Sequence, residues 1–327
     1  MSIRNLNYLL QPRSVALVGA SPKPGSVGRV LARNLMTGFK GDLFLVNPKH
    51  ESIDGRRCWP SVAALPQAPD LTIICTPAAT VPAIVAELGA RGSRAAIVIS
   101  AGFGEGSKGD GTSLQQALLD AAKPSTLRIL GPNCIGLQVP ALGLNASFAA
   151  TAATPGHLAF ITQSGALLTA VLDWAQPRGI GFSHLVSLGD MSDVDFGDML
   201  DYLAGDGQTQ AILAYMEGVT QTRKFMSAAR AAARIKPVVV VKGGRHAEGA
   251  RAAATHTGAL AGSDAVYDTA FRRAGMLRVP SLGALFGAAD ILTLARRPKG
   301  NRLAIVTNGG GMGVLATDAL MDDAGQL

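Results

Sequence analysis

The chain has 327 residues, a length that fits about two domains of ~150 residues each, with room for the start of a third. Hydrophobic residues make up 48% of the sequence and charged residues 16%, which excludes an intrinsically disordered protein, since disorder needs high charge and low hydrophobicity. The net charge of +7 comes from scattered Lys and Arg, and aromatic residues are only 5%, so we expect a protein that handles phosphorylated small molecules and does not bind nucleic acid.

The cysteines and the uncharged stretches indicate the environment of the protein. Cys58, Cys75 and Cys134 are odd in number and lack the CxxC spacing of a zinc site, so we expect neither disulfides nor a bound metal. The longest uncharged stretch, residues 129–172, is interrupted by proline, asparagine and glutamine and cannot form one apolar membrane helix. The N-terminal apolar run is too short for a signal peptide. We therefore expect a cytoplasmic protein that does not associate with membranes.

In the first half of the chain, short apolar runs rich in β-branched residues alternate with helical patterns. Continuously apolar strands that alternate with helices are typical of a parallel sheet covered on both faces, the doubly wound α/β class. The predicted strands are residues 14–19, 43–47, 71–75, 95–100 and 127–130, and the predicted helices are residues 27–37, 81–90 and 112–121.

A stretch with little periodicity, residues 134–155, is expected to separate this first domain from a second one. The same alternation then restarts and predicts a second α/β domain. A further restart at residue 301 holds an apolar strand, residues 302–307, and a glycine-rich turn into a helix, which together predict the start of a third α/β domain. The strands predicted in the second domain are residues 157–162, 182–187, 210–216 and 237–242, and its helices are residues 167–175, 196–204, 222–234 and 264–274.

The first predicted strand leads into a glycine-rich loop that opens a helix, where backbone N–H groups and the helix dipole can hold phosphate. The loop departs from the strict GxGxxG pattern, because only Gly25 and Gly28 have the required spacing. The second strand ends in Asn47-Pro48-Lys49, where an NAD enzyme places Asp or Glu on the ribose hydroxyls. A lysine there favours an extra ribose phosphate, as in NADP or coenzyme A. The alternative is a plain strand–helix turn with a surface lysine.

Small residues follow four strands of the first domain. Because parallel strands bring their carboxyl ends to one edge of the sheet, these loops predict a long crevice for an extended ligand that lies against backbone. The alternative is that each loop is simply short. Besides the first loop, the segments concerned are residues 75–77, 100–105 and 131–134.

Three residues of the second half are candidates for chemistry. Ser164 lies between a strand and a helix, where it is either an N-cap or part of a phosphate site. Glu217 directly follows an apolar strand, an unusual place for a merely solvated carboxylate. His256 lies in a loop of small residues, where a neutral imidazole could attack phosphorus while a nearby carboxylate fixes its tautomer. The alternative is an exposed loop histidine.

The order of these landmarks resembles that of the NDP-forming acyl-CoA synthetases, a family that includes ADP-forming acetyl-CoA synthetase and is related to succinyl-CoA synthetase. The most specific part is the block His-Thr-Gly-x-Leu-Ala-Gly-Ser-Asp at residues 256–264, and residues 307–313 resemble the opening of the family's third domain. The resemblance implies a Rossmann-type CoA-binding domain over residues 1–145. It implies a flavodoxin-like ligase domain with the histidine loop over residues 146–298, and the beginning of a third flavodoxin-like domain over residues 299–327.

The resemblance also implies a reaction, in which acyl-CoA, phosphate and ADP give the free acid, CoA and ATP through an acyl phosphate and a phosphohistidine. His256 is then the phosphorylated nucleophile, and Glu217 is the carboxylate that orients it. The residues expected to bind phosphate are Ser164, Gly165 and Asn133. The residues expected to contact CoA or acyl-CoA are Gly19, Ser21, Gly28, Lys49, Pro77, Ser100 and Gly102.

The sequence holds no ATP-grasp segment, so the resemblance implies that ATP, ADP and Mg²⁺ are bound by an ATP-grasp subunit or domain outside this chain, and we expect an oligomer. Two other hypotheses stay open. Residues 144–148 and 224–230 also resemble bacterial fusion proteins in which a synthetase-like region, joined to a GNAT protein lysine acetyltransferase, acts as an acyl-CoA sensor. An NADP-dependent oxidoreductase is the third hypothesis, although no acid–base pair for hydride transfer is evident. The pair of His256 and Glu217 favours the synthetase, because a sensor needs no phosphoryl acceptor.

Overall fold

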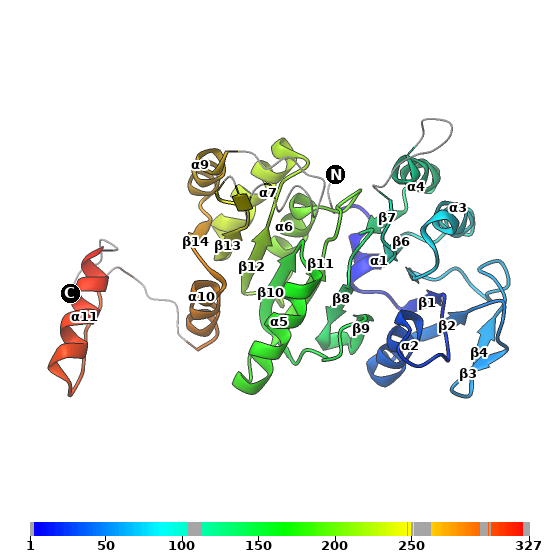
Figure 1. Cartoon of the computed structure of the whole chain (residues 1–327), viewed down its shortest axis with the longest axis horizontal. Helices are drawn as coiled ribbons and strands as arrows, with labels where there is room; N and C mark the ends of the chain where they lie inside the picture. The colour runs from blue at the N-terminus through cyan, green and yellow to red at the C-terminus, as the bar shows by residue number, and fades with distance from the viewer. Residues whose placement is uncertain are drawn as a thin grey trace. The chain divides into compact units, whose positions relative to one another are not determined.

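The computed structural model describes residues 3–103, 113–246, 248–249, 251, 263–294, 300 and 302–322. The chain divides into two compact units, Met1–Ala289 and Asp290–Leu327. The first unit contains two seven-stranded sheets, and the second contains the helix α11 (Gly310–Asp322) (Figure 1).

The first sheet contains the strands predicted for the first half of the sequence. Its order is β3-β4-β2-β1-β5-β6-β7, and every neighbouring pair is parallel except β3 with β4. β1 (Ser14–Val18), β5 (Leu71–Ile74) and β6 (Ala95–Val98) are buried at every residue, which explains their unbroken apolar sequence. The remaining strands are β2 (Asp42–Val46), β3 (Ser52–Ile53), β4 (Arg56–Trp59) and β7 (Arg128–Leu130).

Alternate residues along these strands face two different layers of helices. Leu17 packs in one apolar cluster with residues of α1 and α2, and its neighbour Val18 packs in the other cluster with residues of α3 and α4. Because successive side chains of a strand point to opposite faces, the two clusters cover the two faces of the sheet. The helices are α1 (Leu6–Leu10), α2 (Val27–Gly38), α3 (Val81–Ala90) and α4 (Leu114–Ala122).

The second sheet has the order β14-β13-β12-β10-β11-β8-β9, and its strands are parallel from β14 to β11. β8 pairs antiparallel with β11, and β9 pairs antiparallel with β8. Its strands are β8 (Gly136–Val139), β9 (Leu144–Ser147), β10 (Pro155–Thr162), β11 (Phe182–Ser187), β12 (Ala211–Met216), β13 (Val238–Lys242) and β14 (Leu277–Val279). Its helices are α5 (Gly165–Ala175), α6 (Phe196–Gly205), α7 (Thr222–Ile235), α9 (Asp264–Ala274) and α10 (Leu282–Leu294). Short 3₁₀ turns are η1 (Ala78–Thr80), η2 (Lys123–Ser125), η3 (Pro140–Leu142) and η4 (Gln176–Arg178).

The two sheets are joined by a shared apolar core and by backbone hydrogen bonds. One cluster of buried side chains contains residues from both sheets, among them Leu17 and Ile161. The loop that precedes α6 lies along the end of β7, where the amide of Asp190 donates to the carbonyl of Pro132 at 2.9 Å. The backbones meet so closely that a Cβ on Gly189 would lie 2.1 Å from that same carbonyl oxygen. This contact fixes the loops at the carboxyl ends of the two sheets against each other.

The predicted α/β class is confirmed, but residues 134–155 are not the featureless stretch that the sequence predicts, because β8 and β9 extend the second sheet through them. Each strand has four residues, and their buried positions include polar side chains that bond one another. Gln138 donates to Ser147 at 3.1 Å, and Ser147 donates to Asn145 at 2.6 Å. These polar residues hide the apolar pattern of a buried strand. The domain boundary at residues 145 and 146 stays a prediction and falls within β9.

In the second unit, the predicted helix is present as α11, but the predicted strand at residues 302–307 is not formed. Only Arg302 makes an isolated bridge, residues 303–307 have no regular structure, and Val306 is 95% exposed. An apolar strand needs a neighbour to satisfy its backbone groups, and these residues have none among the described part of the unit. That a third flavodoxin-like domain begins at residue 299 stays a prediction. No described helix is both long and apolar enough to cross a membrane.

A buried histidine lies in the second sheet. His184 on β11 is 3% exposed, and neither ring nitrogen has a hydrogen-bond partner among the described residues. Its Nδ1 lies 3.6 Å from a carboxylate oxygen of Asp206, and its ring meets the ring of Tyr202 edge-on. Burial lowers the pKa of His184 below its ordinary value, although Asp206 opposes the shift. Burial therefore favours the neutral form of the imidazole in the folded chain.

This burial should make the stability of the fold depend on pH. Because the pKa of His184 is lower in the folded chain than in the unfolded chain, the unfolded chain binds the additional proton, and stability is lost as the pH falls below about 6.5. We expect His184→Phe to reduce the slope of the unfolding free energy against pH in that range, by up to about 1.4 kcal/mol per pH unit. Urea unfolding at several pH values measures the slope. The control is His157→Phe, at an exposed site near the start of β10, which should keep the wild-type slope. Equal slopes for the wild type and His184→Phe would contradict the prediction.

Candidate active site

The carboxyl ends of strands from both sheets open onto one cavity of about 490 Å³. The first sheet contributes its loops after β5, β6 and β7, and the second contributes the turn from β10 into α5 and the loop after β11. The lining residues are Val27, Cys75, Ile99, Ser100, Ala101, Asn133, Cys134, Ile135, Phe148, Gln163, Ser164, Gly165, Ala166, Gly189 and Asp190. The structure therefore brings together four of the predicted site residues, namely Ser100, Asn133, Ser164 and Gly165.

Two glycines, one at the end of β1 and one in the first turn of α2, lie where the backbone leaves no room for a side chain. A Cβ on Gly28, in the first turn of α2, would lie 2.1 Å from the carbonyl oxygen of Gly19. Gly19 itself has a φ of +96°, and a Cβ there would approach the sulfur of Cys75. Ser26 is the N-cap of α2 and accepts from the amide of Arg29. The close packing brings the N-terminus of α2 to the end of β1, as a phosphate-binding loop requires.

The two cysteines that line the cavity are not activated thiols. Burial raises the pKa of both Cys75 and Cys134 to about 12, so both remain protonated. The Cys75 thiol donates to the carbonyls of Val18 and Gly19 at 3.4 Å, so it holds the start of the first loop. Their place in the cavity is therefore structural.

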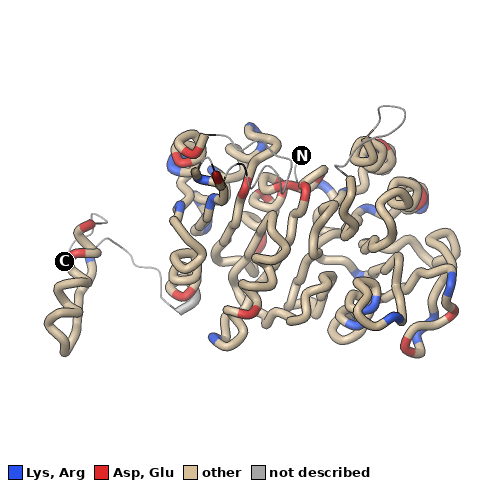
Figure 2. The backbone as a smooth tube through the Cα atoms, in the orientation of Figure 1, with Lys and Arg blue, Asp and Glu red and all other residues tan. Residues whose placement is uncertain are grey.

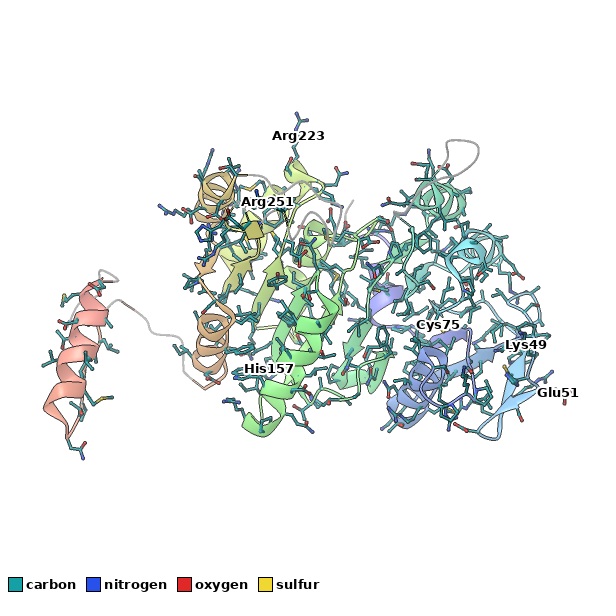
Figure 3. The ribbon with its side chains drawn as sticks, viewed as in Figure 1. Lys49, Glu51, Cys75, His157, Arg223 and Arg251 are labelled. Carbon is teal, nitrogen blue, oxygen red and sulfur yellow. The ribbon has the colours of Figure 1, made fainter. Side chains whose placement is uncertain are left out.

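Lys49 lies outside this cavity, exposed at the carboxyl end of β2 (Figure 3). Its amide donates to the side chain of Asn47 at 2.9 Å, and Asn47 in turn donates to the carbonyl of Ala20 in the first loop at 2.7 Å. On the neighbouring strand β4, the guanidinium of Arg57 lies 3.8 Å from the ring centroid of Trp59. The sequence prediction included Lys49 but missed this cation–π pair, which the adjacent basic and aromatic residues of β4 could have indicated.

The other predicted CoA residues lie at strand ends along the same edge. Ser100 lines the cavity and donates to the carbonyl of Thr76. Gly102 has a φ of +94° with open space around its α-carbon. Pro77 precedes the turn η1, and Ser21 accepts from the amide of Lys23 at 3.1 Å. Lys and Arg are spread over many elements of the chain (Figure 2).

Ser164 and Gly165 form the start of α5 at the cavity wall. Ser164 is the N-cap, and its hydroxyl accepts from the amide of Leu167 at 3.4 Å. A Cβ on Gly165 would lie 2.6 Å from Ile135, so only glycine fits between the helix and that side chain. The N-cap interpretation of Ser164 is confirmed, while phosphate binding by the N–H groups of this turn stays a prediction. Asn133, from the first sheet, donates to the carboxylate of Asp190 at 3.1 Å.

Glu217 follows β12 and is only 8% exposed. Its backbone is held by a residue that lines the cavity: the side-chain oxygen of Gln163 accepts from the amides of Glu217 at 2.6 Å and Gly218 at 2.9 Å. Gln163 was not singled out from the sequence, because an amide side chain in a strand–helix turn has no pattern that distinguishes it from a solvated one. The structure shows that it joins the cavity to the carboxylate.

His256 lies outside the described residues, as do its neighbours 252–262. Before this segment, Lys242 at the end of β13 is 3% exposed, donates to the carbonyl of Gly243 and lies 4.5 Å from the ring centroid of Tyr267 on α9. After this segment, Asp264 at the start of α9 forms an ion pair with Arg278, which lowers the pKa of the Asp264 carboxyl. Burial lowers the pKa of Lys242. No set of described residues could hold a metal ion.

Comparison with known proteins agrees with this architecture. Residues 13–140 match the family model described as "CoA binding domain", and residues 155–292 match "Succinyl-CoA ligase like flavodoxin domain". The chain is 42% identical to "Acetate--CoA ligase [ADP-forming] I subunit alpha" of Pyrococcus furiosus, over 98% of this chain and 70% of that relative. This chain belongs to the NDP-forming acyl-CoA synthetase family.

Two further relatives show how much of the family's architecture the chain spans. It is 46% identical to "Acetate--CoA ligase [ADP-forming] I" of Archaeoglobus fulgidus over 96% of this chain, but it covers only 45% of that relative's length. It is similar in structure to "dinucleotide forming Acetyl-coenzyme A synthetase 1" of Ca. Korarchaeum cryptofilum, solved with phosphate and ADP, with a TM-score of 0.92 and 38% identity over 98% of this chain and 69% of that one. The chain thus corresponds to the α part of longer or multi-subunit synthetases, and none of these relatives is named as an acetyltransferase.

The close contact between Gly28 and the carbonyl of Gly19 can be tested by substitution. Gly28→Ala should force the loop away from α2, because the new Cβ would overlap the carbonyl oxygen of Gly19, and overpacking of this kind costs about 1–3 kcal/mol. Thermal unfolding should show a lower Tm. Gly205→Ala, at the end of α6 with open space around it, is the matched control and should keep the Tm. Equal Tm values for both variants would contradict the predicted packing.

Proposed function

We propose that this chain is the CoA-binding α part of an NDP-forming acyl-CoA synthetase, an acid–thiol ligase. The observation that supports the proposal is the shared cavity, because it joins strand-end loops of the CoA-binding type to the N-terminus of α5 and, through Gln163, to Glu217. Two half-sites that handle a thioester and a phosphate must meet in this way if the acyl group is to pass from sulfur to phosphate.

The proposed reaction has three steps. Phosphate attacks the thioester carbonyl, the C–S bond breaks, and acyl phosphate and CoA form. The imidazole of His256 then attacks phosphorus, the P–O bond to the acyl group breaks, and the carboxylic acid leaves as its anion. ADP takes the phosphoryl group from His256 to give ATP. The A. fulgidus and P. furiosus relatives are named acetate–CoA ligases, so acetyl-CoA is the substrate that we propose.

The residues at the edge of the first sheet fit a CoA thioester. Gly19 and Gly28 let backbone approach backbone at the end of β1, and Lys49 lies exposed at the next strand end, where it can pair with the 3′-phosphate of the ribose. Ser21, Pro77, Ser100 and Gly102 are at the remaining strand ends. An extended ligand that crosses these loops would bring its thioester toward the cavity.

The residues on the second sheet fit phosphate and its transfer. The N–H groups at Ser164 and Gly165 and the side chain of Asn133 would hold phosphate in the cavity. The carboxylate of Glu217 would accept a hydrogen bond from the Nδ1–H or Nε2–H group of His256, which fixes the tautomer and leaves the other ring nitrogen free to attack.

The nucleotide step needs a partner. We propose that ATP or ADP with Mg²⁺ is bound by an ATP-grasp subunit or domain, since the P. furiosus relative is a subunit of a larger enzyme and this chain covers less than half of the A. fulgidus relative. We also propose that the working enzyme is an oligomer located in the cytoplasm.

Binding of CoA tests the first half of the proposal. Lys49→Ala should weaken CoA binding by roughly tenfold or more, because a charge-assisted hydrogen bond to phosphate contributes about 1.5–3 kcal/mol. Its affinity for dephospho-CoA, which lacks the 3′-phosphate, should not change. Calorimetry with CoA, dephospho-CoA, NADPH and NADH measures this.

Lys40→Ala, an exposed lysine that precedes β2 at the opposite end of the strand, is the control and should bind CoA as the wild type does. Binding of NADPH without binding of CoA would contradict the proposal and favour an oxidoreductase.

Phosphorylation tests the second half. With an ATP-grasp partner, Mg²⁺ and labelled ATP, the chain should acquire an acid-labile, alkali-stable label that is absent in His256→Ala. Glu217→Gln should slow labelling and leave CoA binding intact, because it removes the orienting charge but keeps the side-chain volume. The control is His157→Ala, near the start of β10 and so at the opposite end of the strand from the cavity, which should be labelled as the wild type is. If His256→Ala is labelled as fast as the wild type, the assignment is wrong and the acyl-CoA sensor is favoured.

A further inference from the structure

One wall of the cavity is apolar and lies against the start of α5. Ile135, half-buried between β7 and β8, lines the cavity. Two carbons of its side chain, Cγ1 and Cδ1, would lie 2.6 and 2.8 Å from a Cβ on Gly165, the first residue of α5, so the side chain packs directly against the Gly165 backbone. The cavity therefore has an aliphatic side chain beside the N–H groups that the proposed function assigns to phosphate.

The position of this wall is fixed by the second sheet. The amide of Ile135 donates to the hydroxyl of Ser187, the last residue of β11, at 3.2 Å, and its carbonyl accepts from the amide of Phe148 at 3.2 Å. Phe148 directly follows β9, also lines the cavity and packs against the apolar core shared by both sheets. Ile135 and Phe148 thus form one apolar surface, held by hydrogen bonds at the ends of β9 and β11.

The charge of the cavity limits what can lie on this surface. Among the described residues that line the cavity, Asp190 is the only charged one, and its carboxylate accepts from Asn133 at 3.1 Å. A second carboxylate buried here would meet a like charge and no cation among those residues, which disfavours it. An apolar chain, in contrast, would gain from burial against Ile135 and Phe148.

The proposed reaction brings the acyl group to this surface. An attacking phosphate oxygen must come within about 3–3.5 Å of the thioester carbon. With phosphate held at Ser164 and Gly165, that carbon lies at the start of α5, and the acyl chain that it carries lies next to Ile135. This placement rests on the proposed function, because it uses the phosphate site proposed there.

We propose that Ile135 and Phe148 form the acyl subsite, and that the side chain of Ile135 limits the length of the acyl chain. The acetyl group is then the smallest occupant of the subsite, and longer chains fit until they meet Ile135. The substrate class is CoA thioesters of monocarboxylic acids with uncharged, apolar chains. Thioesters of dicarboxylic acids are disfavoured, because their second carboxylate would be buried beside Asp190.

The charge limit is tested by calorimetry on the full chain, without phosphate so that no reaction follows binding. Butyryl-CoA and succinyl-CoA share a chain of four carbons, but the succinyl chain ends in a carboxylate. The wild type should bind butyryl-CoA about tenfold more tightly than succinyl-CoA, or better. Equal affinities would overturn the proposed class.

The length limit is tested by the ratio of the affinities for hexanoyl-CoA and acetyl-CoA. Ile135→Ala removes three carbons and should raise this ratio about tenfold or more, because each additional methylene that becomes buried strengthens binding roughly fourfold. Ile135→Val removes one carbon, disturbs the packing less and should raise the ratio roughly two- to fourfold. A purely structural role of Ile135 would change both affinities alike and leave the ratio unchanged.

The matched control is Ile84→Ala on α3. Ile84 is also half-buried, but it packs against the other apolar cluster of the first sheet and does not line the cavity. This variant should keep the wild-type ratio.

The outcomes distinguish the two proposals. If the wild type binds neither CoA nor any of the thioesters, the proposed function fails, and the inference fails with it. If the wild type binds them and both Ile135 variants keep its ratio, only the inference is overturned. A ratio that rises equally in Ile84→Ala would also overturn it, because the change would then not come from the cavity wall.

Discussion

The candidate site depends on a set of close contacts between the loop after β11 and the end of β7, which join the carboxyl ends of the two sheets. Parallel strands can only present their following loops at one edge, so each sheet brings its small and polar residues together by topology alone. What brings the two edges to one cavity is a row of backbone contacts, from Asp190 to Pro132, Ser192 to Gly131 and Val194 to Ile129, supported by an apolar core common to both sheets. Without these contacts, the loops of each sheet would form two separate half-sites.

Close backbone approach recurs wherever the site is built. Gly28 against Gly19, Gly165 against Ile135 and Gly243 against Tyr215 each leave no room for a Cβ. In each case the glycine lets a helix or a strand end come within contact distance of another element. The abundance of glycine in this chain thus has a physical role at these positions and is not only a sign of loops.

The polar network of the second sheet extends from the cavity to the carboxylate that the proposed chemistry needs. Gln163 lines the cavity and holds the backbone of Glu217 and Gly218. Buried polar groups of this kind are stable only when their partners are all in place. The network therefore couples the geometry of the cavity to the orientation of Glu217.

By itself the sequence determined the α/β class, most of the helices and parallel strands, and the strand ends at which Lys49, Ser164 and Glu217 lie, because apolar runs and helical periodicity are local properties. It did not predict β8 and β9, whose buried positions hold hydrogen-bonded polar side chains, nor the absence of a strand at residues 303–307, which have no neighbouring strand among the described residues. Only the tertiary structure decided that loops of two sheets share one cavity and that Gln163 holds the backbone of Glu217, because these contacts join residues whose closeness depends on packing and leaves no local pattern.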